Sequence, residues 1–536
     1  MNESKPAHLE GKPLPQDVPL PWVGDIPARG LAQCPDRTAV IFADGGGRTM
    51  SYRELERMTR AFCAAMRARG LVDGARVAYL GRNNELYMPM LFGALRAGCV
   101  IVTLNWRLTA PEIAYQLQDS GAAFLIADAD LMPVTMKACE GLTMQPEILP
   151  TDDPAASRDL RRLMAGDAPA SECPHELDQV VVQMYTSGTT GKPKGVQLTH
   201  GCLTYARHCE MIDGSYAGWQ AGTTHLSAMP NFHIAGTSWM LIGLTRLSTM
   251  VLTADPSPAN LLPLIEKYNP GCSFIVPTVI RALVDAIRAG GRPAPRMKQI
   301  AYGASAIGES LLREAMETFG CEFGQAFGMT EVTGTCTYLP NADHDLSRPQ
   351  VLKSVGRPLA GMAVQIRDGE GRLLNVGEAG EIWVRTPTAM LGYWNLPKAT
   401  QEALVDGWYR TGDGGRIDAD GFLYLTDRIK DMIISGGENV YPVEIEERLR
   451  LHPAVLEAAV IGLPDPHWGE AVHAMVELRP GQQVEADTLR AFAREGLAGF
   501  KCPRSIRFTT ALPRTASGKV QRAQVRSAWR ESIAAG

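Results

Sequence analysis

The segment from Tyr185 to Gly195 reads Y-T-S-G-T-T-G-K-P-K-G, and its residue types are those needed to bind a polyphosphate. Its eleven residues include four aliphatic hydroxyls, three glycines and two lysines. Glycines let a backbone turn present successive N–H groups to an oxyanion, and hydroxyl and ammonium groups add donors and positive charge. Apolar runs flank the segment at Val180–Met184 and Val196–Leu198, which predicts a strand–loop–strand element whose loop projects from a sheet.

The segment is not a Walker A loop, which requires G-x-x-x-x-G-K-[ST] opening directly into a helix. Only two residues separate Gly188 from Gly191, and Pro193 follows Lys192 where Ser or Thr should stand. Proline lacks an N–H and disfavours helix at the residue before it. A plain surface turn is the other alternative, and the many donors with so few acids argue against it.

Two further segments have side chains suited to a nucleotide. Thr330 stands beside Glu331, and a hydroxyl next to a carboxylate suits a site for a nucleotide with Mg²⁺, which is usually held by one or two carboxylates and by phosphate oxygens. Asp413 ends the run Tyr409–Asp413, and one carboxylate can accept hydrogen bonds from both vicinal hydroxyls of a ribose. Either segment alone is common in loops, and only its place among the other motifs makes it a candidate metal or ribose contact.

The composition is that of a globular protein with more than one domain. At 536 residues and 58.1 kDa the chain exceeds the size at which one hydrophobic core keeps growing. A net charge of −5 gives no electrostatic footprint for nucleic acid. We expect neither a secretory signal, since the start lacks a basic and an apolar region, nor a spanning helix, since no run of about 18 apolar residues occurs. The 11 scattered cysteines favour reduced thiols, and we therefore predict a cytoplasmic protein.

Helix and strand signals alternate along the first part of the chain. Ser51–Glu54 and Thr109–Glu112 are capping boxes that predict helix starts. Strands and helices expected around them are Ala75–Leu80, Glu85–Ala97, Val100–Leu104 and Ala123–Ala127. Such alternation predicts an α/β fold with parallel-rich sheets covered by helices.

A different texture follows Thr426. It predicts a small α+β unit of about 105 residues, which is an ordinary domain size. The helices and strands expected in it are Glu444–Leu451, Ala454–Ile461, Ala471–Leu478, Asp487–Glu495, a short strand near Ile506 and a final helix from Gln521.

The motifs resemble, in the same order, those of the adenylate-forming superfamily, which includes acyl-CoA synthetases, peptide-synthetase adenylation domains and beetle luciferases. The resemblance runs from about Ser51 to Lys519. It implies a large N-terminal domain for ATP and carboxylate at residues 1–427, with a barrel-like subdomain, and a small mobile C-terminal lid domain at residues 428–536. Its hinge would be Lys430, in a segment very close to the acyl-CoA synthetase version.

The resemblance also implies roles for individual residues. Lys519 would bridge carboxylate and α-phosphate oxygens, where a cation helps one anion attack another. Thr330 would touch the α-phosphate, Glu331 would hold Mg²⁺, and His233 would lie where the acyl pocket meets the pantetheine tunnel. The residues implied in binding ATP or coenzyme A are Thr186, Ser187, Gly188, Thr189, Thr190, Lys194, Gly303, Ala304, Ser305, Gln325, Phe327, Gly328, Asp413, Arg428, Lys430, Gly436 and Gly437.

The sequence departs from the superfamily at the adenine contacts. Phe327 stands where the superfamily usually has tyrosine, which keeps a stacking ring but loses its hydroxyl. The turn Tyr302–Ala306 has fewer glycines than the familiar version and no proline.

The predicted function is ATP-dependent acyl-CoA synthesis with Mg²⁺, from a small-molecule carboxylate, ATP and CoA. Small residues at Ala235, Gly236, Gly303 and Gly334, with no charged residue in those segments, favour a medium or long fatty acid or a bulky aromatic or alicyclic carboxylate. Three alternatives stay open: an adenylation enzyme that delivers to a carrier protein, a luciferase-like oxygenase and a non-catalytic nucleotide-binding protein. A homodimer is also left open.

Overall fold

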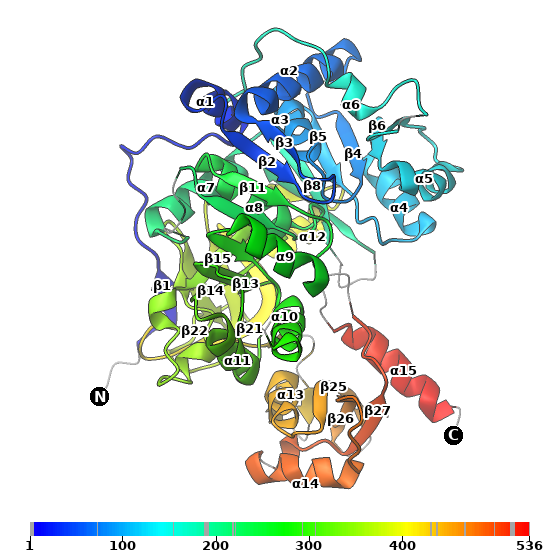
Figure 1. Cartoon of the computed structure of the whole chain (residues 1–536). Helices are drawn as coiled ribbons and strands as arrows, with labels where there is room; N and C mark the ends of the chain where they lie inside the picture. Colours follow the sequence, from blue (N-terminus) through cyan, green and yellow to red (C-terminus); the bar gives the residue numbers. More distant parts are fainter. Residues whose placement is uncertain are drawn as a thin grey trace.

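The computed structural model describes residues 5–71, 73–153, 155–186, 192–216, 219, 221–291, 293–305, 307–428, 431, 433–435, 438–465, 468–497, 499–514 and 520–534. It confirms the predicted α/β class, with a large sheet-rich N-terminal domain and a small C-terminal domain that lies apart from it (Figure 1). No helix in these residues is long and apolar enough to cross a membrane.

The first large sheet has seven strands and contains the predicted strand–loop–strand element. Five neighbouring strands run parallel, and β9 and β19 complete the sheet with antiparallel pairing. In spatial order the strands are β19 (Gly392–Tyr393), β9 (Lys194–Thr199), β8 (Val180–Thr186), β5 (Val100–Thr103), β4 (Arg76–Leu80), β6 (Phe124–Ala127) and β7 (Glu147–Pro150).

The second large sheet has nine strands. Six neighbouring strands, β14 to β2, are parallel, and antiparallel strands close both edges. In spatial order they are β16 (Arg357–Pro358), β15 (Gly334–Leu339), β14 (Glu322–Met329), β13 (Gln299–Gly303), β12 (Cys272–Phe274), β10 (Thr224–Ser227), β11 (Thr249–Leu252), β2 (Thr38–Phe42) and β3 (Arg48–Ser51).

Helices cover these sheets and fill the space between them. Every residue of α3 and all but Ala235 of α8 are buried, as expected for helices that are largely apolar on all sides; the charged residue of α3, Arg96, pairs with Glu56. Both predicted capping boxes form, at Ser51 before α2 and at Thr109 before α4. The helices are α1 (Ile26–Gln33), α2 (Tyr52–Ala68), α3 (Tyr87–Ala97), α4 (Ala110–Ser120), α5 (Met132–Cys139), α6 (Leu160–Leu163), α7 (His200–Asp213), α8 (Ile234–Thr245), α9 (Pro258–Tyr268), α10 (Pro277–Gly290), α11 (Glu309–Phe319) and α12 (Pro397–Ala403).

A third sheet of six antiparallel strands joins the N-terminus to the region after β16. Its strands are β1 (His8–Glu10), β17 (Ala363–Arg367), β18 (Gly380–Arg385), β21 (Trp408–Ile417), β20 (Leu404–Val405) and β22 (Leu423–Arg428).

The C-terminal domain has the α+β composition expected from sequence. Its strands are β24 (Glu438–Val440), β23 (Ile433–Ser435), β26 (Gly469–Leu478), β25 (Val455–Asp465) and β27 (Ser505–Thr509), and its helices are α13 (Pro442–Arg450), α14 (Ala486–Gly496) and α15 (Arg522–Ala534). All pairs are antiparallel except β26 with β27.

Candidate active site

The base of the candidate phosphate loop is an antiparallel hairpin. Strands β8 and β9 pair in a register that places Thr186 opposite Lys194 and Tyr185 opposite Gly195. A side chain at Gly195 would meet the end of the Gln183 side chain at 2.6 Å, so this glycine packs closely against Gln183 within the hairpin. The predicted phosphate contacts Ser187, Gly188, Thr189 and Thr190 lie outside the described residues.

The predicted metal ligand, Glu331, lies against this hairpin. It sits in the short 3-10 helix Thr330–Val332, directly after β14, and is only 9% exposed. Its Oε1 accepts hydrogen bonds from the Thr186 hydroxyl (3.4 Å) and from the Tyr393 hydroxyl (3.1 Å). Burial raises the pKa of this carboxyl above its ordinary value. A buried carboxylate next to a phosphate loop is a position where a cation would be stabilised.

This donor set suits Mg²⁺ bound to a nucleotide. Within the residues that the structure describes, no group of three or more His, Cys, Asp or Glu side chains could hold a metal alone. Mg²⁺ commonly takes one or two carboxylates and completes its shell with phosphate oxygens and water. Glu331 supplies such a carboxylate, with the Thr186 hydroxyl beside it.

The predicted adenine contacts meet at the carboxyl ends of two parallel strands. Gly303 at the end of β13 pairs with Ala326 in β14, and a Cβ on Gly303 would lie 2.2 Å from the Ala326 carbonyl oxygen. Ala304 then turns with φ +63°, which redirects the chain toward Ser305. The other contacts named from sequence, Gln325 and Phe327, lie in β14 on either side of Ala326. The structure therefore brings these residues together.

Gly328 separates Phe327 from the Thr330–Glu331 pair and is packed against backbone. A Cβ at Gly328 would lie 1.6 Å from the Gly334 carbonyl oxygen, at a point where the register between β14 and β15 shifts. Only glycine allows this approach of the two strands.

The predicted ribose contact, Asp413, lies in β21 and opposes Arg428 of β22 in the strand register. Its negative charge acts on the Glu331 carboxyl and helps to raise the pKa of that group, so the two carboxylates are electrostatic neighbours. The turn before Asp413 is held by Glu381, which accepts hydrogen bonds from the Gly412 N–H (3.2 Å) and from Arg410 (2.9 Å). The sequence carries no signal for Glu381, because it holds this turn only through the pairing of its strand, β18, with β21.

His233 precedes α8 and is partly buried, with its Nε2 atom inside the protein. Burial, with Arg107 as a smaller cause, lowers the pKa of this imidazole to about 4, so it is neutral at pH 7. Its Nε2 has no hydrogen-bond partner among the described residues. The loop before it is fixed by Asn83, whose amide donates to the Met229 carbonyl (2.8 Å) and accepts from the Asn231 N–H (2.9 Å).

The glycines used to infer a roomy acyl pocket have another explanation. A Cβ on Gly236 would lie 2.1 Å from the Pro230 carbonyl oxygen, and one on Gly303 would meet the Ala326 carbonyl. Both positions are therefore small because backbone segments approach each other. Gly334 has more room, since its nearest neighbours are the Ser238 and Ile234 side chains at 3.4 and 4.0 Å, but its φ of +107° favours glycine there as well.

The remaining predicted residues lie outside the described part of the chain. They are Lys519, Lys430, Gly436 and Gly437; the backbone of Arg428 is described in β22, but its side chain is not.

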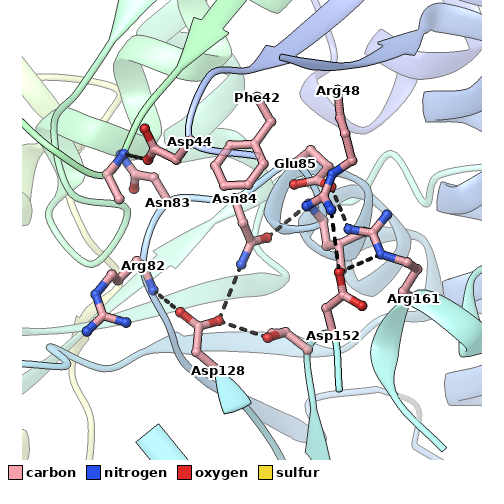
Figure 2. A pocket seen from close by; sticks show the side chains of 13 residues that line it. Phe42, Asp44, Arg48, Arg82, Asn83, Asn84, Glu85, Asp128, Asp152 and Arg161 are labelled. Atoms are coloured by element: carbon pink, nitrogen blue, oxygen red, sulfur yellow. Dashed lines mark hydrogen bonds and ion pairs between the residues drawn. The ribbon is translucent and has the colours of Figure 1, made fainter. Parts of the chain in front are cut away.

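A separate polar pocket of about 240 Å³ lies at the carboxyl ends of β2, β4, β6, β7 and β11 (Figure 2). Its charged side chains pair with one another: Glu85 Oε1 contacts Arg48 (2.9 Å) and Arg161 (2.5 Å), and Arg161 also contacts Asp152 (2.9 Å). These ion pairs connect loops of both large sheets. None of the predicted site residues lines this pocket.

Two family models match the chain: "AMP-binding enzyme" over residues 28–394 and "AMP-binding enzyme C-terminal domain" over residues 444–519. The chain is 39% identical to a fatty acid–[acyl-carrier-protein] ligase, ScoC, of Streptomyces coeruleorubidus, over 90% of this chain and 92% of that protein. It is 36% identical to a feruloyl-CoA synthase of an Amycolatopsis species, over 94% and 98%.

Among solved structures, the chain is similar to the o-succinylbenzoate CoA synthetase MenE of Bacillus subtilis in complex with its acyl-adenylate intermediate. The TM-score is 0.81 at 30% identity, covering 95% of this chain and 98% of that one. The family models, the relatives and the fold agree. The chain belongs to the AMP-binding enzyme family of adenylate-forming ligases, and it is an AMP-forming acid–thiol ligase.

Proposed function

We propose that this protein is an ATP-dependent acyl-CoA synthetase that works in two steps. In the first, a carboxylate oxygen attacks the α-phosphorus of ATP, forming acyl-adenylate and releasing pyrophosphate. In the second, the thiol of CoA attacks the acyl carbonyl, forming the thioester and releasing AMP with the thiol proton passing to solvent. The observation that supports the proposal is that three parts of the structure meet: the β8–β9 hairpin at the base of the candidate phosphate loop (the phosphate hairpin), the buried Glu331 carboxylate and Asp413.

ATP would lie across these three elements. The phosphates would be bound by the β8–β9 loop, with Thr186 and Lys194 at its base, and the ribose by Asp413 with Arg428. Glu331 would hold Mg²⁺, which supplies positive charge to the phosphate oxygens as negative charge builds up on them. Because Glu331 is buried, its charge is screened less by water than that of a surface carboxylate.

The C-terminal domain would supply and then withdraw a catalytic cation. Lys519 would lie between carboxylate and α-phosphate oxygens in the first step, where charge accumulates. Residues 428–536 would then rotate about Lys430, which removes Lys519 and opens a path for pantetheine past Gly436 and Gly437. Family membership supports these assignments.

The acyl group would be uncharged at its far end. Arg207 lies beside α8, where its guanidinium donates to Ser238 Oγ (3.3 Å), but it is buried and paired bidentately with Glu210 (2.8 and 2.9 Å). Its charge is thus already neutralised and is not presented to a second substrate carboxylate. We propose a medium or long fatty acid or a bulky aromatic or alicyclic acid, in keeping with the names of the fatty-acid and feruloyl relatives.

A panel of these acids tests the proposal. Acid-dependent exchange of pyrophosphate into ATP measures the first step, and CoA-dependent release of AMP measures the second. If none of the acids supports exchange, the proposed adenylation is wrong.

We also propose that the enzyme acts in the cytoplasm, in keeping with its 11 free cysteines.

A carrier protein is the second candidate acceptor, because the 39% identical relative is named as a fatty acid–[acyl-carrier-protein] ligase. Thioester formation on a phosphopantetheinylated carrier protein, compared with free CoA at equal thiol concentration, distinguishes the two. A preference for the carrier by more than about tenfold in kcat/KM would replace CoA as the assigned acceptor.

A further inference from the structure

We infer that Tyr393 and Trp394 form a positioning element that holds the Glu331 carboxylate in register with the phosphate hairpin. Tyr393 ends β19, the edge strand that pairs with β9, and Trp394 follows it. The Trp394 backbone N–H continues the pairing with β9 at Gly195, and successive side chains along a paired segment point to opposite sides. One residue of this pair therefore reaches the candidate metal ligand and the other reaches the back of the hairpin. The inference rests on the proposed function.

Tyr393 contacts the candidate metal site directly. Its hydroxyl donates to Glu331 Oε1 at 3.1 Å, the same oxygen that accepts from Thr186. The Tyr409 hydroxyl hydrogen-bonds to the Tyr393 hydroxyl, and Lys194 Nζ lies 4.6 Å from the centre of the Tyr393 ring. A chain of hydroxyls thus links β21, β19, Glu331 and the start of the phosphate loop.

Trp394 fixes the hairpin from the other side. Its backbone N–H donates to the Gly195 carbonyl (2.7 Å), and its indole Nε1–H donates to the backbone carbonyl of Asp119 at the end of α4 (2.8 Å). The Arg76 guanidinium lies 3.5 Å from the centre of the indole ring, a cation–π contact, and donates to Gln183 Oε1 in β8 (3.1 Å).

Tyr185 closes this set of contacts one residue before Thr186. Its hydroxyl donates to Asp119 Oδ2 (2.7 Å) and accepts from the Gln183 amide (3.0 Å). The indole, the guanidinium, the amide, the phenol and the carboxylate therefore hold both strands at the base of the phosphate loop.

This element matters because the two halves of the site come from different sheets. Glu331 follows a strand of the nine-stranded sheet, whereas the phosphate loop belongs to the seven-stranded sheet. Tyr393 and Trp394 contact both halves. Since catalytic groups must be held within about 0.5 Å of their working positions, a rigid link between metal ligand and phosphate loop affects ATP binding itself.

Binding of ATP without any carboxylate, followed by calorimetry, tests the inference. Tyr393→Phe removes only the hydroxyl, and we expect about tenfold weaker binding in Mg²⁺ but little change in EDTA, because a hydrogen bond to a charged group is lost. Trp394→Phe keeps a ring over Arg76 but loses the indole N–H, and we expect binding to weaken by roughly threefold to tenfold in both conditions.

Tyr424→Phe is the matched control, since Tyr424 lies in β22 and its hydroxyl also donates to a carboxylate, Asp418 Oδ2, at 2.8 Å. Its ATP binding should equal that of the wild type, and the thermal midpoint of each ligand-free variant shows whether the fold is kept. The inference is overturned if Tyr393→Phe and Trp394→Phe both bind ATP as tightly as the wild type. It is also overturned if Tyr393→Phe weakens ATP binding equally with and without Mg²⁺. If the wild type itself does not bind ATP, the proposed function fails instead.

Discussion

Replacing Gly328 with alanine should uncouple Glu331 from the phosphate hairpin. The new Cβ would lie 1.6 Å from the Gly334 carbonyl oxygen, 2.6 Å from its carbonyl carbon and 2.9 Å from the Thr335 Cα. All three are backbone atoms, so no rotamer change can relieve the clash. Ordinary contact begins near 3.4 Å, so the two strands must separate by about 1.8 Å or bend.

The size of the effect follows from what lies next in the chain. Glu331 is three residues beyond Gly328, and its contacts with Tyr393 and Thr186 are already 3.1 and 3.4 Å long. A shift of more than 1 Å breaks both, and a misplacement of 1 Å can cost about a hundredfold in rate. Overpacking alone should cost about 1–3 kcal/mol of unfolding free energy, which a protein of this size can tolerate.

Acid-dependent exchange of pyrophosphate into ATP is the assay, with thermal unfolding measured on the same samples. Gly290→Ala is the control, because no atom lies within 4 Å of the added Cβ at the end of α10. We expect Gly328→Ala to lose about two orders of magnitude in exchange rate while remaining folded. An exchange rate within about twofold of Gly290→Ala would refute the argument that strand separation reaches Glu331.

Four further outcomes are expected. Lys519→Ala should nearly abolish acyl-adenylate formation but leave thioester formation from preformed acyl-adenylate largely intact; equal loss of both half-reactions would contradict its role. Lys430→Pro should do the reverse, because proline locks φ at a hinge, and near-normal thioester synthesis would show that the pivot lies elsewhere. Glu331→Gln should raise the Mg²⁺ concentration needed for half-maximal exchange by at least about tenfold, since a neutral amide is a poorer ligand, and an unchanged value would remove Glu331 as the metal ligand. The pKa of the His233 imidazole is about 4 in the folded protein and about 6.5 in the unfolded chain, so the free energy of unfolding is highest above pH 6.5 and falls as the pH drops toward 4. His233→Gln should therefore reduce the loss of unfolding free energy between pH 7 and pH 4, measured by urea titration, by up to about 3 kcal/mol. A loss equal to that of the wild type would contradict the lowered pKa.

Local patterns predicted most of the elements. The apolar runs around the phosphate loop form β8 and β9, and the Ser51 and Thr109 capping boxes begin helices where expected, because each signal depends on neighbours in sequence. The contacts of Tyr393, Trp394 and Glu381 were missed for the opposite reason. Each partner is distant in sequence and is brought close only by the tertiary fold, and neither tyrosine nor tryptophan carries a motif of its own.

Glycine was the residue type most easily misinterpreted. From sequence, a glycine near a substrate indicates either space or close backbone packing, and composition does not separate these. At Gly236 and Gly303 the neighbouring carbonyl oxygens show that packing is the reason.

The pairing of β19 with β9 also has a consequence for synthesis. Strand β9 emerges from the ribosome at residues 194–199, but the strand that covers its outer edge, β19, follows only at residues 392–393. At about 5–20 residues per second, the edge of the phosphate hairpin stays unpaired for roughly 10–40 s. An exposed edge strand can pair with other chains, so this interval is when a nascent chain most needs protection from aggregation. A chain that stops before residue 392 leaves that edge of the hairpin unpaired.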